Sequence, residues 1–96
     1  MDVQLARNKE GILEARTDAP RWEDGYALIR RLKKQFGAKV KDTFDGPDSR
    51  RWDLQIDGCA IMAYHSDWGE ITISPTESSG ESIVTRIAQS LQHEQS

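Results

Sequence analysis

Two hairpin turns in the second half of the chain constrain its fold more than any other feature. Asp57-Gly58 is a two-residue turn of a type favoured in β-hairpins, because both residues tolerate a positive φ. In the segments that flank it, apolar residues alternate with polar ones, as in a strand with one buried face. The turn therefore predicts three facing pairs on one side of a sheet: Ile56 with Cys59, Leu54 with Ile61, and Trp52 with Ala63.

The second turn, Asp67-Trp68-Gly69, suits a three-residue loop in which the glycine is left-handed. It predicts two further facing pairs: His65 with Ile71, and Ala63 with Ile73. Both isoleucines then lie on the same side as the pairs of the first turn. The two turns were assigned independently, and both place the apolar residues on the same face of the sheet. This agreement predicts an antiparallel meander over residues 38–74.

Further strand segments lie closer to the N-terminus. Val40 and Phe44 alternate with polar neighbours and extend the meander at its start. Residues 1–17 contain two short alternating segments around Asn8-Lys9-Glu10-Gly11, a pattern typical of a hairpin or of one bent strand. We expect one of these two arrangements there.

A first helix is predicted over residues 20–36. Asp18 is the candidate N-cap, Pro20 falls in the first turn, and Gly37 follows the last turn. Gly25 is the one residue that weakens a helix, so it indicates close packing or a later helix start. Apolar residues at three- and four-residue steps form one stripe that should be buried: Trp22, Tyr26, Ile29, Leu32 and Phe36.

A second helix is predicted over residues 79–92. Ser78-Ser79-Gly80-Glu81 has the spacing of a capping box, and an apolar stripe follows it. Two helices covering the apolar face of the meander make one α+β domain over residues 1–96, a two-layer sandwich with both helices on one side. Its core should bury eight residues together: Ile29, Leu32, Trp52, Leu54, Ile61, Ile71, Ile83 and Ile87.

The composition narrows the classes of partner and compartment. The 96 residues include 16 acids and 13 bases, and the net charge of −3 disfavours nucleic acid as a partner. The bases that cluster at residues 30–41 are best explained as a solvated helix face. The longest apolar run, Cys59 to Tyr64, is far shorter than the ~20 residues of a membrane span. With one cysteine and no apolar signal segment, we expect a cytoplasmic protein that contacts no membrane.

No set of residues forms a recognisable catalytic or metal site. Cys59 and His65 lie six residues apart on one strand, about 20 Å at the usual rise, so they cannot act as a dyad. His65-Ser66-Asp67 contains the residue types of a hydrolytic triad, but neighbours on a strand point in different directions. His65, Asp67 and His93 do not make a metal-ligand set. We therefore predict no catalytic residue, no cofactor and no metal, and a protein that is not an enzyme.

The outward side of the meander provides the candidate partner-binding residues. They are Arg51, Asp53, Met62 and Tyr64, extended by Trp68 at a hairpin tip. Arginine and aromatic residues are enriched at interface hot spots, and methionine adapts to irregular surfaces. The alternative is an ordinary solvated sheet face, in which Arg51 packs over Tyr64, its facing residue.

Three features of the C-terminal half carry a resemblance: the stretch Arg50–Gly58 that opens a short meander, the turn at residues 67–69 and the closing helix. In these features the chain is similar to small acidic immunity proteins, with which bacteria neutralise toxins of competing cells, and to neighbouring bacterial families of uncharacterised function. The resemblance implies protein binding and assigns no binding residue.

We therefore predict a non-enzymatic protein-binding module of immunity or antitoxin type. Its partner is a protein toxin or another protein, and the chain itself is a monomer or a homodimer. Two alternatives remain open. One is a structural subunit that assembles through an exposed strand edge. The other is a small domain with an unrecognised site.

Overall fold

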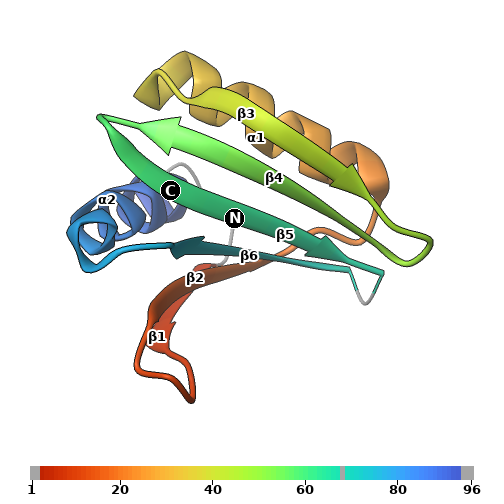
Figure 1. Ribbon diagram of the computed structural model, residues 1–96. Coiled ribbons are helices and arrows are strands. Elements are labelled where there is room, and N and C mark those ends of the chain that lie inside the picture. Colours follow the sequence, from red (N-terminus) through yellow and green to blue (C-terminus); the bar gives the residue numbers. More distant parts are fainter. Residues whose placement is uncertain (1–2, 68, 94–96) are drawn as a thin grey trace.

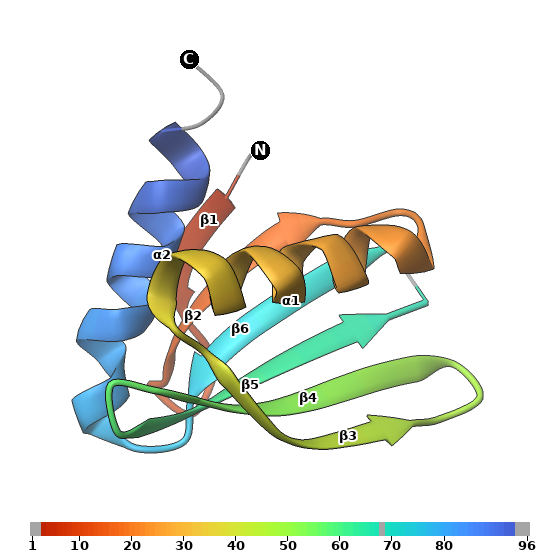
Figure 2. The ribbon, with the colours of Figure 1, turned by 90° about the horizontal axis from the view of Figure 1, so that it is seen from above.

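The computed structural model describes residues 3–67 and 69–93 and shows a six-stranded antiparallel sheet with two helices on one side (Figures 1 and 2). The predicted α+β sandwich is confirmed. No helix within the described residues is long and apolar enough to cross a membrane. The elements in chain order are β1 Val3–Arg7, β2 Leu13–Asp18, α1 Trp22–Phe36, β3 Lys39–Asp45, β4 Ser49–Ile56, β5 Cys59–Ser66, β6 Glu70–Pro75, a 3₁₀ turn Ser78–Gly80, and α2 Glu81–His93.

The strands lie in the order β1-β2-β6-β5-β4-β3, and every neighbouring pair is antiparallel. The N-terminal segment forms a hairpin rather than one bent strand, and it joins the meander where β2 pairs with β6. Its turn is closed by Asn8, whose side-chain oxygen accepts hydrogen bonds from the backbone N–H groups of Glu10 and Ile12 at 2.8 and 3.0 Å.

The register predicted from the two turns is confirmed. Leu54 faces Ile61, Trp52 faces Ala63, and β5 and β6 pair as expected, with His65 opposite Ile71. Asp57 and Gly58 have φ values of 51° and 78°, as a turn with two left-handed residues requires. The meander therefore has the predicted inside and outside from β4 to β6.

The first strand of the meander departs from the prediction. A β-bulge between Val40 and Asp42 shifts the pairing of β3 with β4 by one residue. Val40 still faces Leu54 and packs against the core. Beyond the bulge the sides are exchanged, so Phe44 faces Arg51 on the side of the sheet away from the helices and is 45% exposed. The alternation of Val40 and Phe44 is thus misleading, because both residues were expected on one side.

The core lies between the sheet and the two helices, as predicted. All eight residues that we expected there are buried, each with 5% or less of its surface exposed. From the sheet side, β4, β5 and β6 supply alternate residues. From the helix side, α1 supplies Leu28, Ile29 and Leu32, and α2 supplies a stripe that ends at Leu91. Helices and sheet therefore bury one continuous apolar layer.

Helix α1 begins later than expected. Asp18 is the last residue of β2, and Pro20 precedes the helix, so neither has the predicted role at the helix start. The N-cap is Arg21, whose backbone N–H donates to the Asp24 carboxylate at 3.0 Å. This carboxylate caps the first turn in place of Asp18, and the hydrogen bond lowers the pKa of Asp24. The helix ends as predicted at Gly37, which has a φ of 65°.

The buried stripe of α1 also differs from the prediction at its N-terminal half. Gly25 is buried there, whereas Trp22 and Tyr26 are 38% and 43% exposed. A Cβ on Gly25 would lie 2.4 Å from Nδ1 of His65, so only glycine allows this approach of helix to sheet. Gly25 lies inside the helix, so of the two explanations for the glycine the structure supports close packing, and Trp22 and Tyr26 lie at the margin of the buried stripe.

Helix α2 follows the 3₁₀ turn and begins at Glu81. Arg7 of β1 forms an ion pair with Glu81 at 2.9 Å, and the Gln92 side chain accepts a hydrogen bond from the backbone N–H of Val3 at 2.8 Å. The hydrogen bond from Arg7 lowers the pKa of Glu81. These contacts attach both ends of β1 to α2.

We expect Leu54→Ala to lower the free energy of unfolding by about 2–5 kcal/mol, because it removes a 2%-exposed side chain from the centre of this layer. Lys34→Ala, on the exposed side of α1, should change it by less than about 0.5 kcal/mol. Urea denaturation measures both. Equal stability of the two variants would contradict the observed register.

Gly25→Ala should also destabilise the protein, although the same change in an exposed helix interior stabilises by about 1 kcal/mol. The added methyl group would overlap the His65 ring. Combining it with His65→Ala should remove the overlap and make the alanine less costly than in the wild-type background. Thermal denaturation of the four proteins in this cycle gives the coupling. A Gly25→Ala variant that melts above the wild type would show that the contact is not tight.

Candidate functional site

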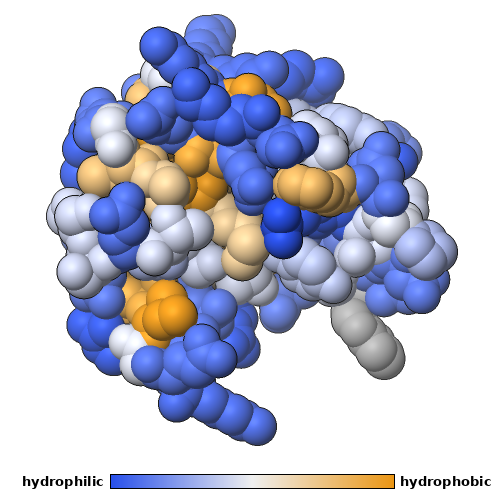
Figure 3. Space-filling view, viewed as in Figure 1, coloured by the Kyte–Doolittle hydropathy of each residue, from blue (hydrophilic) through white to orange (hydrophobic). Residues whose placement is uncertain are grey.

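The face of the sheet away from the helices carries the predicted partner-binding residues. Phe44, Arg51 and Tyr64 lie side by side on β3, β4 and β5, because Arg51 faces each of the other two in the sheet register. Asp53 and Met62 face each other in the next row on the same side. We call these five residues the open-face patch. Figure 3 shows this part of the molecule, with hydrophobic areas exposed between hydrophilic ones.

The arginine of the open-face patch is held from two sides. Its guanidinium carbon lies 4.2 Å from the centre of the Phe44 ring, and its Nε lies 3.3 Å from a carboxylate oxygen of Asp53. The guanidinium thus stacks on Phe44, whereas the solvated-face alternative placed it over Tyr64. Tyr64 is 40% exposed beside it. Stacking and pairing restrict the conformations of the arginine side chain.

Phe44 was not among the predicted site residues. Sequence periodicity assigned it to the side of Val40, and only the bulge brings it to Arg51. The polar residues around it, Asp42, Thr43 and Asp45, indicate that this segment is exposed. They do not show where a bulge falls, and so do not show to which side Phe44 points. The fifth predicted residue, Trp68, lies outside the described residues.

A hollow of about 520 Å³ adjoins the open-face patch on the side of the Asp57-Gly58 turn. We call it the bulge hollow, because Lys41, the extra residue of the β3 bulge, stands at its rim. The residues around it belong mainly to β4 and β5 and include Lys41, Asp53, Gln55, Ala60, Met62 and Thr76. Its surface is largely apolar. The hollow and the patch share Arg51, Asp53 and Met62, so they form one continuous surface.

The residues weighed for catalysis are not brought together. Cys59 and His65 stand at the two ends of β5. The Cys59 thiol is partly buried and lies 3.9 Å from the hydroxyl and carbonyl oxygens of Ser79. His65 is 1% exposed, and its Nε2 lies 2.8 Å from the carbonyl oxygen of Ala19. His65 therefore holds the chain that leads into α1. Among the described residues no three acids, histidines or cysteines are placed to share a metal ion.

Arg50, next to the open-face patch in the chain, lies on the opposite side of the sheet. Its guanidinium carbon is 5.2 Å from the Trp22 ring and 4.8 Å from the Tyr26 ring, and its Nε pairs with Asp45 at 3.2 Å. It also donates a hydrogen bond to the Tyr26 hydroxyl. Sequence periodicity does not reveal this cluster, since it places both aromatic residues in the core. Its contacts join α1 to β4 and explain why these rings are only half buried.

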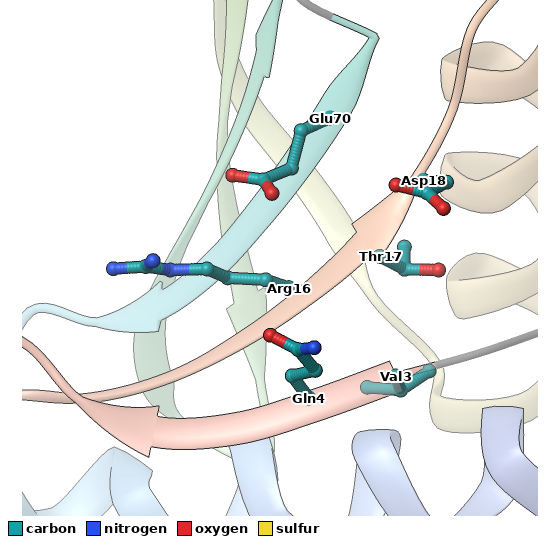
Figure 4. A pocket seen from close by; sticks show the side chains of 6 residues that line it. All are labelled: Val3, Gln4, Arg16, Thr17, Asp18 and Glu70. Carbon is teal, nitrogen blue, oxygen red and sulfur yellow. The ribbon is translucent and has the colours of Figure 1, made fainter.

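A second cavity, of about 270 Å³, lies at the other end of the sheet. Figure 4 shows Gln4, Arg16 and Glu70 projecting into view from three strands that lie side by side. Arg16 already pairs with Glu14 at 2.9 Å, and this hydrogen bond raises the pKa of the arginine. The lining of this cavity is mostly polar, so it offers a partner's apolar side chain less surface than the bulge hollow does.

The chain matches no protein-family model, no curated protein and no solved structure.

Proposed function

We propose that this protein is a non-enzymatic protein-binding module that inhibits a partner protein, in the manner of an immunity protein or antitoxin, and that it binds through the open-face patch. One observation carries the proposal. Both helices cover the same face of the sheet, and the uncovered face presents two exposed aromatic side chains on either side of a stacked arginine.

The composition of the open-face patch supports binding. Aromatic residues, arginine and methionine are enriched in protein interfaces, and hot spots are commonly aromatic or arginine. The side chains stand on three paired strands, so the backbone holds them in fixed positions. A partner therefore meets a surface that is largely preorganised, which reduces the entropy lost on binding.

The two strands at the edges of the sheet favour the face over the edge as the binding surface. Edge strand β3 is interrupted by its bulge and carries Lys39 and Lys41, two features that oppose pairing with another strand. Edge strand β1 has five residues, and the N–H of Val3 is already bonded to Gln92. These features support a monomer that binds by its face rather than a subunit that assembles by strand pairing.

Inhibition follows from blocking. A domain of this size seated on a partner's functional surface excludes other molecules from it. The net charge of −3 attracts a basic partner at long range, which raises the association rate more than it deepens the affinity. Close recognition then depends on the open-face patch itself, where Arg51 and Asp53 neutralise each other.

Tyr64→Ala and Arg51→Ala should each weaken partner binding by about 2 kcal/mol or more and leave the melting temperature nearly unchanged. Lys34→Ala is the matched control on the far side of the sheet. Each of the four proteins is immobilised and incubated with a lysate. Lysate proteins that are retained by the wild type and the control, but not by either patch variant, are then purified, and their binding is measured by calorimetry. The partner's own activity should fall in proportion to added wild type but not to added Tyr64→Ala. Retention of the same proteins by all four chains would contradict the proposal.

Light scattering of the purified chain should give the mass of a monomer at micromolar concentration, because the bulge and the lysines of β3 oppose edge pairing. A dimer that persists on dilution would favour the alternative, a subunit that assembles with itself. Lys41→Val would then be expected to change the dimer affinity, whereas Tyr64→Ala would not.

A further inference from the structure

We infer that the bulge hollow receives an apolar side chain of the partner protein that stands next to an aspartate or glutamate in that partner. The inference rests on the proposed protein-binding function and specifies the chemistry of the partner. At about 520 Å³ the hollow falls within the common range for ligand sites, roughly 300–1,000 Å³. The apolar residues of its floor and the charged residues at its rim determine which side chain can bind there.

The floor of the bulge hollow is apolar. Ala60 and Met62 point outward from β5, where they face Gln55 and Asp53 of β4. An alanine between longer neighbours leaves the depression, and the flexible methionine adapts its shape to the group that enters. An apolar side chain that covers this floor displaces water from it, which favours binding.

Lys41 brings an ammonium group to the rim of the bulge hollow, whereas its neighbour Asp42, which faces Asp53, does not line the hollow. Arg51 and Asp53 pair with each other at 3.3 Å. Lys41 is exposed, and within residues 3–67 and 69–93 it forms no ion pair. A carboxylate beside the apolar group would complete a pair with Lys41, whereas an amine there would be repelled.

The bulge explains why Lys41 forms no ion pair with the part of the chain that the structure describes. In a regular ladder Lys39 faces Gln55 and Val40 faces Leu54, so Lys41 would come directly opposite Asp53 and pair with it. The bulge instead sets Asp42 opposite Asp53 and leaves Lys41 without a facing residue. Asp53 then pairs with Arg51 on its own strand. Bulges commonly re-aim a side chain next to a binding site, and this one supplies a free ammonium group to the hollow.

The test uses two small probes that differ at a single group, which is charged in one probe and neutral in the other. N-acetylphenylalanine carries a carboxylate beside its ring, and N-acetylphenylalaninamide replaces that carboxylate with a neutral amide. Each is titrated into the ¹⁵N-labelled full chain, and amide shifts are followed by NMR. The variants are Lys41→Met and, as a control on α1, Lys34→Met.

We expect the acid to shift the amides of Ala60, Met62 and Thr76 and to bind about two- to fivefold more tightly than the amide, the range of one exposed ion pair. Lys41→Met should abolish that preference, Lys34→Met should keep it, and high salt should weaken it. Equal binding of the two probes, or shifts confined to other residues, would overturn the inference. The probe titration uses neither the Tyr64 nor the Arg51 variant and needs no partner protein, so its failure is distinguishable from failure of the proposed function.

Discussion

The cross-strand register set by the Asp57-Gly58 turn is the constraint on which the rest of the structure depends. Side chains alternate between the two faces of a strand, so a slip of one residue would turn Leu54 out to solvent and Arg51 into the core. Burying an unpaired guanidinium is costly, which penalises the slipped register a second time. The same turn therefore places both the core and the open-face patch.

The helices decide which face of the sheet is available. Each helix has one apolar stripe and so can cover only one surface, and both stripes lie against the same side. The close contact of Gly25 with His65, and the Arg50 cluster, hold α1 there. The opposite face is left uncovered by the described chain. It is rigid because it is a six-stranded sheet, and it can hold a set of side chains in place for recognition.

A single irregularity, the bulge at Lys41, gives that face its chemistry. It brings Phe44 from the expected core side to Arg51, where the guanidinium stacks on the ring. It also separates Lys41 from Asp53 and leaves the lysine at the rim of the bulge hollow, without an ion pair among the described residues. The same feature interrupts an edge strand and so opposes self-association. The proposed binding surface and the interruption of this edge strand thus both depend on one extra residue.

The sequence by itself determined the class of fold, the two turns, the register of β4, β5 and β6, and the placement of Arg51, Asp53, Met62 and Tyr64 on one face, because local turn chemistry and period-two alternation are sufficient for these. Only the tertiary structure decided the bulge, the exposure of Trp22 and Tyr26, and the helix start at Trp22. A bulge changes the side of every later residue without changing the residue types. The burial of Gly25 in place of Trp22 and Tyr26 accompanies a close contact of the glycine with His65, 40 residues away, which no local pattern contains.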